Sequence, residues 1–264
     1  MGSPKELIVS RSYDDLKLRL KQLLEESFSN FKAASTNSKR YSIAVSGASM
    51  INILSDVFPS LTSLSSEDWK SWLIFLVDER LVSFDNPGSS FGSYNSTLLP
   101  KCPLLSVEQF VPIDPTLDAE ACAADYELRM KTLLDDVNPE VCSFPRLNMV
   151  LLGFGPDGHT ASLFPGHALL DEKTKWIASI TDSPKPPSTR VTFTLPLIEA
   201  AHSVVVVSTG SSKAEVVRRV FEEDDQSLPV NLIKSPFLDR EKVVWLIDSD
   251  AAGLLRLEDD AVDV

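Results

Sequence analysis

The chain has 264 residues, of which 43% are hydrophobic and 24% are charged, and its formal net charge at pH 7 is −13. This composition is typical of a folded globular protein and excludes a disordered one. Because acidic residues outnumber basic ones and no basic run occurs, we expect neither a nucleic-acid partner nor binding to an anionic membrane surface.

The cysteines and the apolar runs indicate the compartment. Cys102, Cys122 and Cys142 form no close pair, which is typical of structural thiols in a reducing environment. No apolar run approaches the ~20 residues that span a bilayer, and residues 1–20 contain no apolar signal core. We therefore expect a cytoplasmic protein that is a monomer or a weak dimer.

The predicted elements alternate between helix and strand along the chain. Residues 12–15 have the form of a capping box and open a helix that continues to Phe31. A strand over 41–45 breaks into the turn 46–49, and helical spacing then returns until Pro59. The later elements are a strand over 72–77, a helix bearing Leu117, Ala121, Ala124 and Leu128, strands over 147–152 and 204–207, a helix bearing Ala214, Val217 and Phe221, and a last strand over 243–247.

This order of elements predicts the fold class. The run 73–77 lacks polar alternation, as is typical of a strand buried on both faces of a parallel sheet. Strands that alternate with helices predict a doubly wound α/β architecture, with a mostly parallel sheet and helices on both faces. Since no composition break marks a boundary, we expect a single domain over 1–264, with flexible ends at 1–10 and 258–264.

Two turns that follow predicted strands contain small and basic residues. In open α/β sheets, ligands bind at the carboxyl ends of the strands. The turn Ser46-Gly47-Ala48-Ser49 could surround an anion with backbone N–H groups, or it could be a tight turn with Ser49 as a helix N-cap. Lys213 follows the strand over 204–207 and could reach an anion at the same edge, or it could be a solvated surface lysine.

Three charged residues, Asp78-Glu79-Arg80, directly follow a buried strand with no turn residue between. A solvated strand end would explain one or two of them. Two carboxylates beside an arginine suit substrate hydroxyls together with an anionic group, which Arg80 could clamp in a bidentate manner. The pattern therefore favours a ligand-binding role.

The segment 153–160 contains three glycines and a proline, a composition that demands a special backbone path. It presents Asp157 and His159 two residues apart. Histidine titrates near neutral pH, as a general base must. We therefore predict a chemical role for His159 and a structural one for His167 and His202, the other two histidines.

Several other kinds of site are disfavoured. The histidines lack the spacing of a helical zinc pair and the cysteines form no CxxC, so we expect no metal site. The sequence has no GxSxG elbow, no Walker lysine loop and no full GxGxxG motif, which argues against a serine nucleophile and a bound nucleotide.

Six long segments in order resemble the 6-phosphogluconolactonase family, in particular its eukaryotic, cytosolic members, and the similarity covers nearly the whole chain. The segments are VSGAS at 45–49, VDERLVSFDNPGSSFGSYNSTLL at 77–99, LLGFGPDGHTASLFPGH at 151–167, DSPKPPSTRVTFTLPLIEAA at 182–201, STGSSKAEV at 208–216 and LPVNLI at 228–233. The resemblance implies a Rossmann-like sheet shared with the glucosamine-6-phosphate deaminases. It also implies hydrolysis of 6-phospho-D-glucono-1,5-lactone to 6-phospho-D-gluconate, in the oxidative pentose phosphate pathway, with no cofactor.

The resemblance further implies roles for individual residues. The general base of the family falls on His159, and Arg80 matches a residue that binds substrate; with Asp157 they form the predicted catalytic set. Other matching positions lie in phosphate-binding segments or in a basic stretch near the substrate. The predicted substrate- and phosphate-binding set is Ser46, Gly47, Ala48, Asp78, Gly155, Lys185, Arg190 and Lys213.

One position departs from the family pattern. Members usually read SGGS where this chain has Ala48. If that position needs a positive φ, Ala48 carries strain on the order of 1–2 kcal/mol, and its methyl group could crowd a phosphate.

The expected mechanism needs no covalent intermediate, because a δ-lactone is an activated ester. His159, oriented by Asp157 or by a backbone carbonyl, would take a proton from the water that attacks C1. Arg80 or N–H groups of the glycine-rich loop would stabilise the charge on the carbonyl oxygen.

Two alternatives remain open from the sequence. The first is a glucosamine-6-phosphate deaminase or related isomerase; these resemble one another in placing an acidic residue near the GxDGH-like loop, and this chain has none between His159 and Asp171. The second is a sugar-phosphate-binding protein without activity. Ala48 supports that alternative, whereas the intact DER and GxDGHT segments argue against it.

Overall fold

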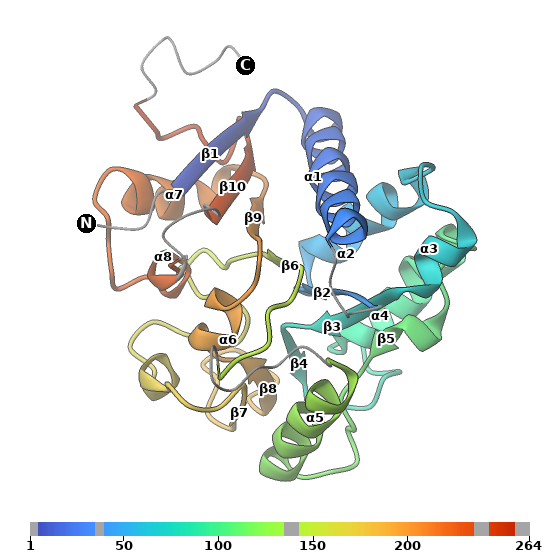
Figure 1. The fold of residues 1–264 in the computed structure, drawn as a ribbon. Coiled ribbons are helices and arrows are strands. Elements are labelled where there is room, and N and C mark those ends of the chain that lie inside the picture. The colour runs from blue at the N-terminus through green and yellow to red at the C-terminus, as the bar shows by residue number, and fades with distance from the viewer. Residues whose placement is uncertain (1–4, 35–39, 135–142, 235–242, 257–264) are drawn as a thin grey trace.

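The computed structural model describes residues 5–34, 40–134, 143–234 and 243–256. Within these residues, seven strands form one sheet in the order β1-β10-β9-β6-β2-β3-β5 (Figure 1), and every pair of neighbours is parallel. The strands are β1 (Lys5–Ser10), β2 (Tyr41–Val45), β3 (Trp72–Leu76), β5 (Phe110–Val111), β6 (Met149–Leu152), β9 (Val204–Ser208) and β10 (Val243–Asp248).

Helices cover both faces of this sheet. Successive residues of a strand enter different cores: Met149 and Leu151 pack on one face of β6, and Val150 and Leu152 on the other. The first core includes buried residues of α1 (Tyr13–Ala33), α2 (Ser49–Val57), α3 (Ser66–Lys70) and α4 (Ser90–Thr97), and the second those of α5 (Ala119–Leu133), α6 (Leu195–Glu199), α7 (Ala214–Phe221) and α8 (Pro229–Leu232). The doubly wound α/β prediction is confirmed.

Short 3₁₀ turns complete the described elements. They are η1 (Phe58–Ser60), η2 (Leu99–Lys101), η3 (Val107–Gln109), η4 (Ala168–Asp171) and η5 (Ser211–Lys213).

The two N-terminal helices begin differently. The Ser12 side chain accepts a hydrogen bond from the Asp15 amide and caps α1, as its sequence predicts. At α2, by contrast, the N-cap residue is Ala48, which provides no side-chain hydrogen bond, and Ser49 is the first helical residue. The alternative in which Ser49 is the N-cap is therefore wrong. The turn enters the helix through the unusual backbone of Ala48, with φ 54° and ψ −126°.

A second, antiparallel sheet was not predicted. It has the order β4-β8-β7, formed by β4 (Asp78–Arg80), β8 (Arg190–Phe193) and β7 (Ile177–Ile180). The segment Asp78–Arg80 is thus a strand and not a loop at a strand end. Val77 links the sheets, since its amide donates to Val45 of β2 and its carbonyl accepts from Phe193 of β8.

The N-terminal segment is ordered in its described part. Lys5–Ser10 pairs with β10 along its whole length, from Lys5 opposite Val243 to Ser10 opposite Asp248. The expectation of a flexible end over 1–10 is therefore wrong for these six residues, because the edge of β10 provides partners for their backbone groups. Residues 1–4 and 258–264 lie outside the described residues.

The sheet also has a topological switch point. From β2 the chain continues to β3 and β5 on one side, and from β6 it continues to β9 and β10 on the other. The loops that follow β2 and β6 therefore leave the sheet next to each other, where doubly wound proteins bind their ligands. Ser46 Oγ accepts a hydrogen bond from the Gly153 amide at 3.0 Å and joins these two loops.

Candidate active site

The glycine-rich loop after β6 is folded back on itself. The Gly155 amide donates to the His159 carbonyl at 2.8 Å, and the Gly158 amide donates to the Gly155 carbonyl at 2.9 Å. Gly158 has φ +80°, a conformation that L side chains rarely adopt. This tight path brings Asp157 and His159 to the same side of the loop.

Gly155 makes room for these two side chains. A Cβ atom at this position would lie 2.1 Å from His159 Cε1 and 2.5 Å from Asp157 Oδ1, distances that no real Cβ adopts. N–H groups of this loop are predicted as possible oxyanion donors, but the amides of Gly155 and Gly158 are bonded within the loop and that of Gly153 is bonded to Ser46 Oγ. These three amides therefore do not support that role, and Gly155 acts by leaving space.

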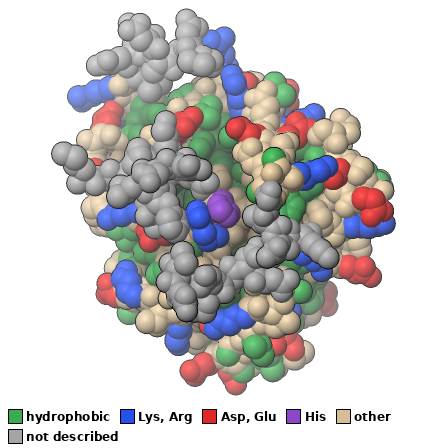
Figure 2. All heavy atoms as spheres, viewed as in Figure 1, with side chains coloured by type: hydrophobic (Ala, Val, Ile, Leu, Met, Phe, Trp, Pro, Cys, Tyr) green, Lys and Arg blue, Asp and Glu red, His purple; other side chains and the backbone are tan. Residues whose placement is uncertain are grey.

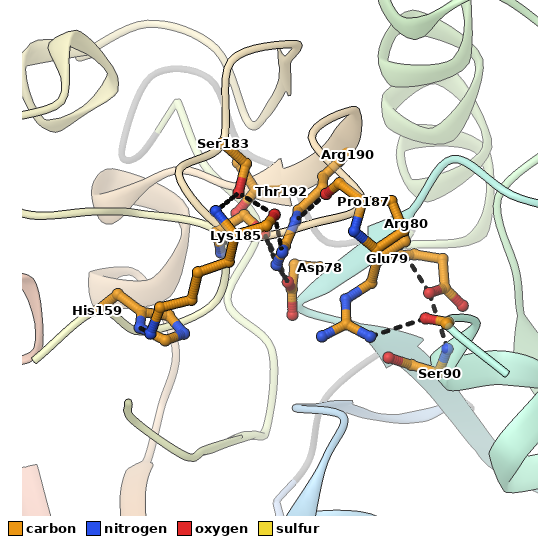
Figure 3. A network of polar contacts seen from close by, with 12 residues as sticks. Asp78, Glu79, Arg80, Ser90, His159, Ser183, Lys185, Pro187, Arg190 and Thr192 are labelled. Atoms are coloured by element: carbon orange, nitrogen blue, oxygen red, sulfur yellow. Dashed lines mark hydrogen bonds and ion pairs between the residues drawn. The ribbon is translucent and has the colours of Figure 1, made fainter. Parts of the chain in front are cut away.

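His159 and Asp157 form a close pair beside Lys185. His159 Nδ1 lies 2.5 Å from Asp157 Oδ1, and Lys185 Nζ lies 3.0 Å from each of these atoms. Figure 3 shows the Lys185 side chain next to the His159 ring. The imidazole stacks on Phe164 with the ring centroids 4.9 Å apart, and its side chain is 18% exposed. The predicted dyad is thus assembled at a partly open position.

The protonation of the dyad follows from these contacts. Burial opposes the ionisation of Asp157, but hydrogen bonds with His159 and Lys185 outweigh it and lower the Asp157 pKa to about 2. Burial also lowers the pKa of His159, and the Lys185 charge adds to this effect, while Asp157 opposes it. Since the His159 pKa lies below its usual 6.5, the ring is neutral at pH 7.

Arg80, the predicted substrate clamp, extends from β4. Its Nη1 donates to the Gly88 carbonyl at 2.7 Å, whereas its buried Nε has no hydrogen-bond partner among the described residues. In Figure 3 the Arg80 guanidinium and the His159 ring lie on either side of Asp78. A buried guanidinium N–H without a partner is unfavourable unless a ligand accepts from it.

Glu79, in contrast, is not a ligand-binding carboxylate. It is 1% exposed and accepts hydrogen bonds from the amides of Arg80, Ser90 and Phe91 at 2.7–2.8 Å. Ser89 Oγ donates to it as well, at 3.1 Å. Burial raises the pKa of Glu79 although these donors oppose the effect. Glu79 therefore fixes β4 to the first turn of α4.

Asp78 and Arg190 also bind other protein groups. Asp78 Oδ2 accepts from Ser162 Oγ at 2.6 Å and lies 3.9 Å from Arg190 Nη1. The Arg190 side chain is 3% exposed, and it donates to the carbonyls of Pro187 at 2.9 Å and Lys185 at 2.7 Å. Arg190 therefore holds the turn that presents Lys185, and direct contact of Arg190 with substrate stays a prediction with little support from this geometry.

The turn after β2 is built closely against α4. The Ser46 carbonyl accepts from Tyr94 Oη at 2.6 Å, and a Cβ at Gly47 would lie 2.3 Å from Ser90 Oγ. Ala48 has a positive φ of 54°, so the condition for backbone strain at this position is met.

Lys213 reaches from η5 over the loop that follows β6. Its Nζ donates to the Phe154 carbonyl at 2.7 Å and lies 5.7 Å from the Phe154 ring centroid. Burial, and then the charge of Lys185, lower the pKa of Lys213 below 10.5. The predicted cation is thus half-buried at the same edge as the dyad. On the face shown in Figure 2, a histidine side chain lies beside a basic one near the centre.

The comparison with family models decides the relationship. The model described as glucosamine-6-phosphate isomerases/6-phosphogluconolactonase matches residues 14–245. The chain belongs to this family.

Individual relatives agree with this membership. A 6-phosphogluconolactonase of Rattus norvegicus is 37% identical over 257 residues, which cover 96% of this chain and 95% of the relative. A 6-phosphogluconolactonase of Homo sapiens is 38% identical over 218 residues, which cover 82% of this chain and 81% of the relative. Several plant relatives of similar identity carry the description chloroplastic.

Solved structures extend the comparison. A 6-phosphogluconolactonase from Trypanosoma cruzi superposes with a TM-score of 0.80 at 27% identity and covers 97% of this chain and 99% of its own. A monomeric glucosamine-6-phosphate deaminase superposes with a TM-score of 0.70 at 18% identity, covering 95% of this chain and all of its own, and shares the fold.

Sequence reasoning missed the support beneath the dyad in this family member. The Val230 amide of α8 donates to the Gly158 carbonyl at 3.1 Å, and Leu228 Cδ2 lies 2.7 Å from the position of a Cβ on Gly158. The segment LPVNLI at 228–233 carried the resemblance without an assigned role. Only the tertiary contact shows that it packs against the turn between Asp157 and His159.

The described residues contain neither a cluster of metal ligands nor a membrane-spanning helix. No group of three or more His, Cys, Asp or Glu side chains within them is arranged to hold a metal ion. No helix among them is long and apolar enough to cross a bilayer.

Proposed function

We propose that this chain hydrolyses 6-phospho-D-glucono-1,5-lactone to 6-phospho-D-gluconate, the second step of the oxidative pentose phosphate pathway. The observation that carries the proposal is the partly exposed His159 ring, which is paired through Nδ1 with Asp157. The relatives that cover most of the chain are named for this activity.

The pairing defines the atom that acts as the base. With the Asp157 carboxylate ionised, His159 Nδ1 carries the hydrogen and donates it to Asp157, so the lone pair resides on Nε2. Nε2 accepts a proton from water while the water oxygen bonds to C1 of the lactone. The carbonyl electron pair then moves onto its oxygen, and a tetrahedral oxyanion forms.

The second step returns the proton. The oxyanion re-forms its C–O double bond, the bond between C1 and the ring oxygen breaks, and this oxygen takes the proton from Nε2. Arg80 is the oxyanion donor that we favour, because its Nε lacks a partner among the described residues and the amides of Gly153, Gly155 and Gly158 are engaged. Such a donor typically contributes about 10²–10³ in rate.

The phosphate of the substrate would bind near the loop after β6. The backbone of the turn after β2 provides donors on one side of this loop, and the ammonium of Lys213, which follows β9, provides them on the other. Binding energy at this distant group positions the ring above the base.

The replacement of His159 by alanine tests the proposal. A general base contributes about 10²–10⁴ in rate, so H159A should lose that factor in kcat and keep its affinity for the product. The assay follows lactone hydrolysis with the spontaneous reaction subtracted. His167→Gln is the control, because His167 pairs with Asp182 at 3.1 Å outside the site. A wild-type kcat in H159A contradicts the assignment of the base.

The other activity in the family name serves as a counter-test. Ammonia release from glucosamine 6-phosphate at a rate comparable to lactone hydrolysis contradicts the proposed substrate. The chain lacks an acidic residue between His159 and Asp171, which favours the lactone.

We propose in addition that the protein is cytoplasmic and a monomer or weak dimer. Cys102 and Cys122 are buried free thiols, as is common in a reducing compartment; Cys142 lies outside the described residues. Fluorescence localisation of the full chain and sedimentation velocity test these two points.

A further inference from the structure

Lys185 lies on the side of His159 that is away from the proposed reaction. Its Nζ is 3.0 Å from Nδ1 of the ring and 3.0 Å from Asp157 Oδ1, and these two atoms are 2.5 Å apart. The three groups form a compact triangle around Nδ1, whereas the base of the reaction is Nε2. Lys185 therefore contacts the part of the ring that does not meet the substrate.

The protein holds Lys185 in this position from several directions. Arg190 Nη2 donates to its carbonyl at 2.7 Å, and Ser183 Oγ donates to the same carbonyl at 2.9 Å. The Lys185 amide donates to Ser183 Oγ at 3.3 Å. The turn between β7 and β8 is thus braced by a buried guanidinium, and Figure 3 shows the lysine extended from it toward His159.

The charges in the triangle act on the ring in opposite senses. An ionised Asp157 alone would stabilise a positively charged imidazolium, which cannot accept a proton. The Lys185 ammonium, 3.0 Å from Nδ1, opposes this effect. The other charged groups that face the site are Asp78, which also favours the imidazolium, Lys213, which faces Asp157 and Lys185, and Arg190, which packs on Phe164 beneath the ring.

We propose that Lys185 is a positioning residue for the general base: it fixes the Asp157 carboxylate and offsets its charge, so that His159 remains a neutral imidazole. This inference rests on the proposed function and deepens it. It gives Lys185 a role different from the substrate contact that the sequence predicts.

The decisive experiment measures kcat against pH for the wild type, Lys185→Met and Lys185→Arg. In K185M the acidic limb of the kcat–pH profile, where kcat falls as His159 is protonated, should move to higher pH by about 1–2 units, because a neighbouring charge shifts a pKa by this amount. The loss at pH 6 should then reach about tenfold, and kcat on the alkaline plateau should fall much less. K185R keeps the charge and should keep the limb near its wild-type position.

A second variant should shift the acidic limb in the opposite direction. Asp157→Asn removes the anion and should move the acidic limb to lower pH, together with a loss of kcat because the ring is less well oriented. The double variant D157N/K185M should bring the limb back toward that of the wild type. A K185M enzyme with a raised KM and an unmoved limb would overturn the inference and make Lys185 a substrate ligand.

An NMR titration of the His159 ring in the resting enzyme separates this inference from the proposed function. The ring pKa should rise in K185M and fall in D157N in the absence of any substrate, with circular dichroism to verify folding. An unchanged ring pKa in K185M contradicts the inference even if H159A is inactive. Conversely, an active H159A contradicts only the proposed base.

Discussion

Single residues in the site are constrained by backbone geometry as much as by chemistry. Ala48 occupies a backbone conformation with φ 54° and ψ −126°. Glycine adopts this conformation at little cost, whereas a residue with a Cβ atom adopts it only with strain. The departure from the family's usual SGGS thus has a physical consequence for stability, although α2 still begins at the next residue.

Replacing Ala48 by glycine should therefore stabilise the protein. Glycine relieves the backbone strain of the folded state, but it also increases the entropy of the unfolded chain. The net gain in the free energy of unfolding is about 1 kcal/mol, which corresponds to a rise in Tm of about 2–4 °C. Ala44→Gly in the buried strand β2 is the control and should lower Tm. Equal losses of Tm in both variants would contradict the positive φ of Ala48.

A second single residue, Lys213, provides a test of phosphate binding. Lys213→Ala removes a half-buried cation and should raise KM about tenfold or more, with kcat within a few-fold, because a charged hydrogen bond contributes about 1.5–3 kcal/mol. In the wild type, KM should also rise at alkaline pH before 10.5 is reached, since the lowered pKa makes Lys213 lose its charge early. Lys173→Ala, at an exposed lysine, is the steady-state control. An unchanged KM in K213A means that the phosphate binds elsewhere.

At the scale of elements, the short helix α8 supports the loop that carries the dyad. Leu228 is 1% exposed and packs on Gly158, and the neighbouring Val230 amide holds the Gly158 carbonyl at 3.1 Å. The position of the loop that carries Asp157 and His159 therefore depends on a segment about 70 residues later in the chain.

Leu228→Ala should lower kcat more than it changes KM. The truncation costs about 2–5 kcal/mol of stability, and a shift of the loop moves the base from its productive position. Leu20→Ala is a matched control, because Leu20 is equally buried in α1 and belongs to the other core. Both variants are assayed well below their Tm; an equal kcat in the two contradicts the support role of α8.

Prediction from the sequence succeeded where a local pattern determines the structure. The apolar runs predicted the parallel strands, and the Gly-rich segment with Asp157 and His159 predicted the dyad. It failed where long-range pairing decides: Asp78–Arg80 forms a strand because β8 offers its edge, and Glu79 is buried because α4 directs amides at it. A charge pattern alone does not distinguish a ligand-binding carboxylate from one that caps a helix.

At the scale of the whole molecule, the first described strand, β1, pairs with the last, β10, at one edge of the sheet. β1 covers the edge of β10, and Lys5 adds hydrogen bonds to Asn231 and, at 3.3 Å, to Asp224, next to α8. The N-terminal strand thus connects the edge of the sheet to the region that supports the loop of Asp157 and His159.

Deletion of residues 1–10 should destabilise the protein and promote association. The loss of a paired strand exposes the edge of β10, a template for pairing with other chains, and should lower Tm by about 5 °C or more. Thermal unfolding and light scattering of the deletion variant and the full chain measure the effect. Identical Tm and scattering would contradict a structural role for β1.

Arg80 and Lys185 belong to the antiparallel sheet and its turn, whereas Asp157 and His159 follow a strand of the parallel one. The pair of Asp157 and His159 and the side chains of Arg80 and Lys185 are thereby mounted on two separate sheets, with the Lys185 side chain reaching across between them. A mutation in the smaller sheet that shifts the turn of Lys185 would therefore also change the surroundings of the His159 ring, although this turn lies outside the glycine-rich loop.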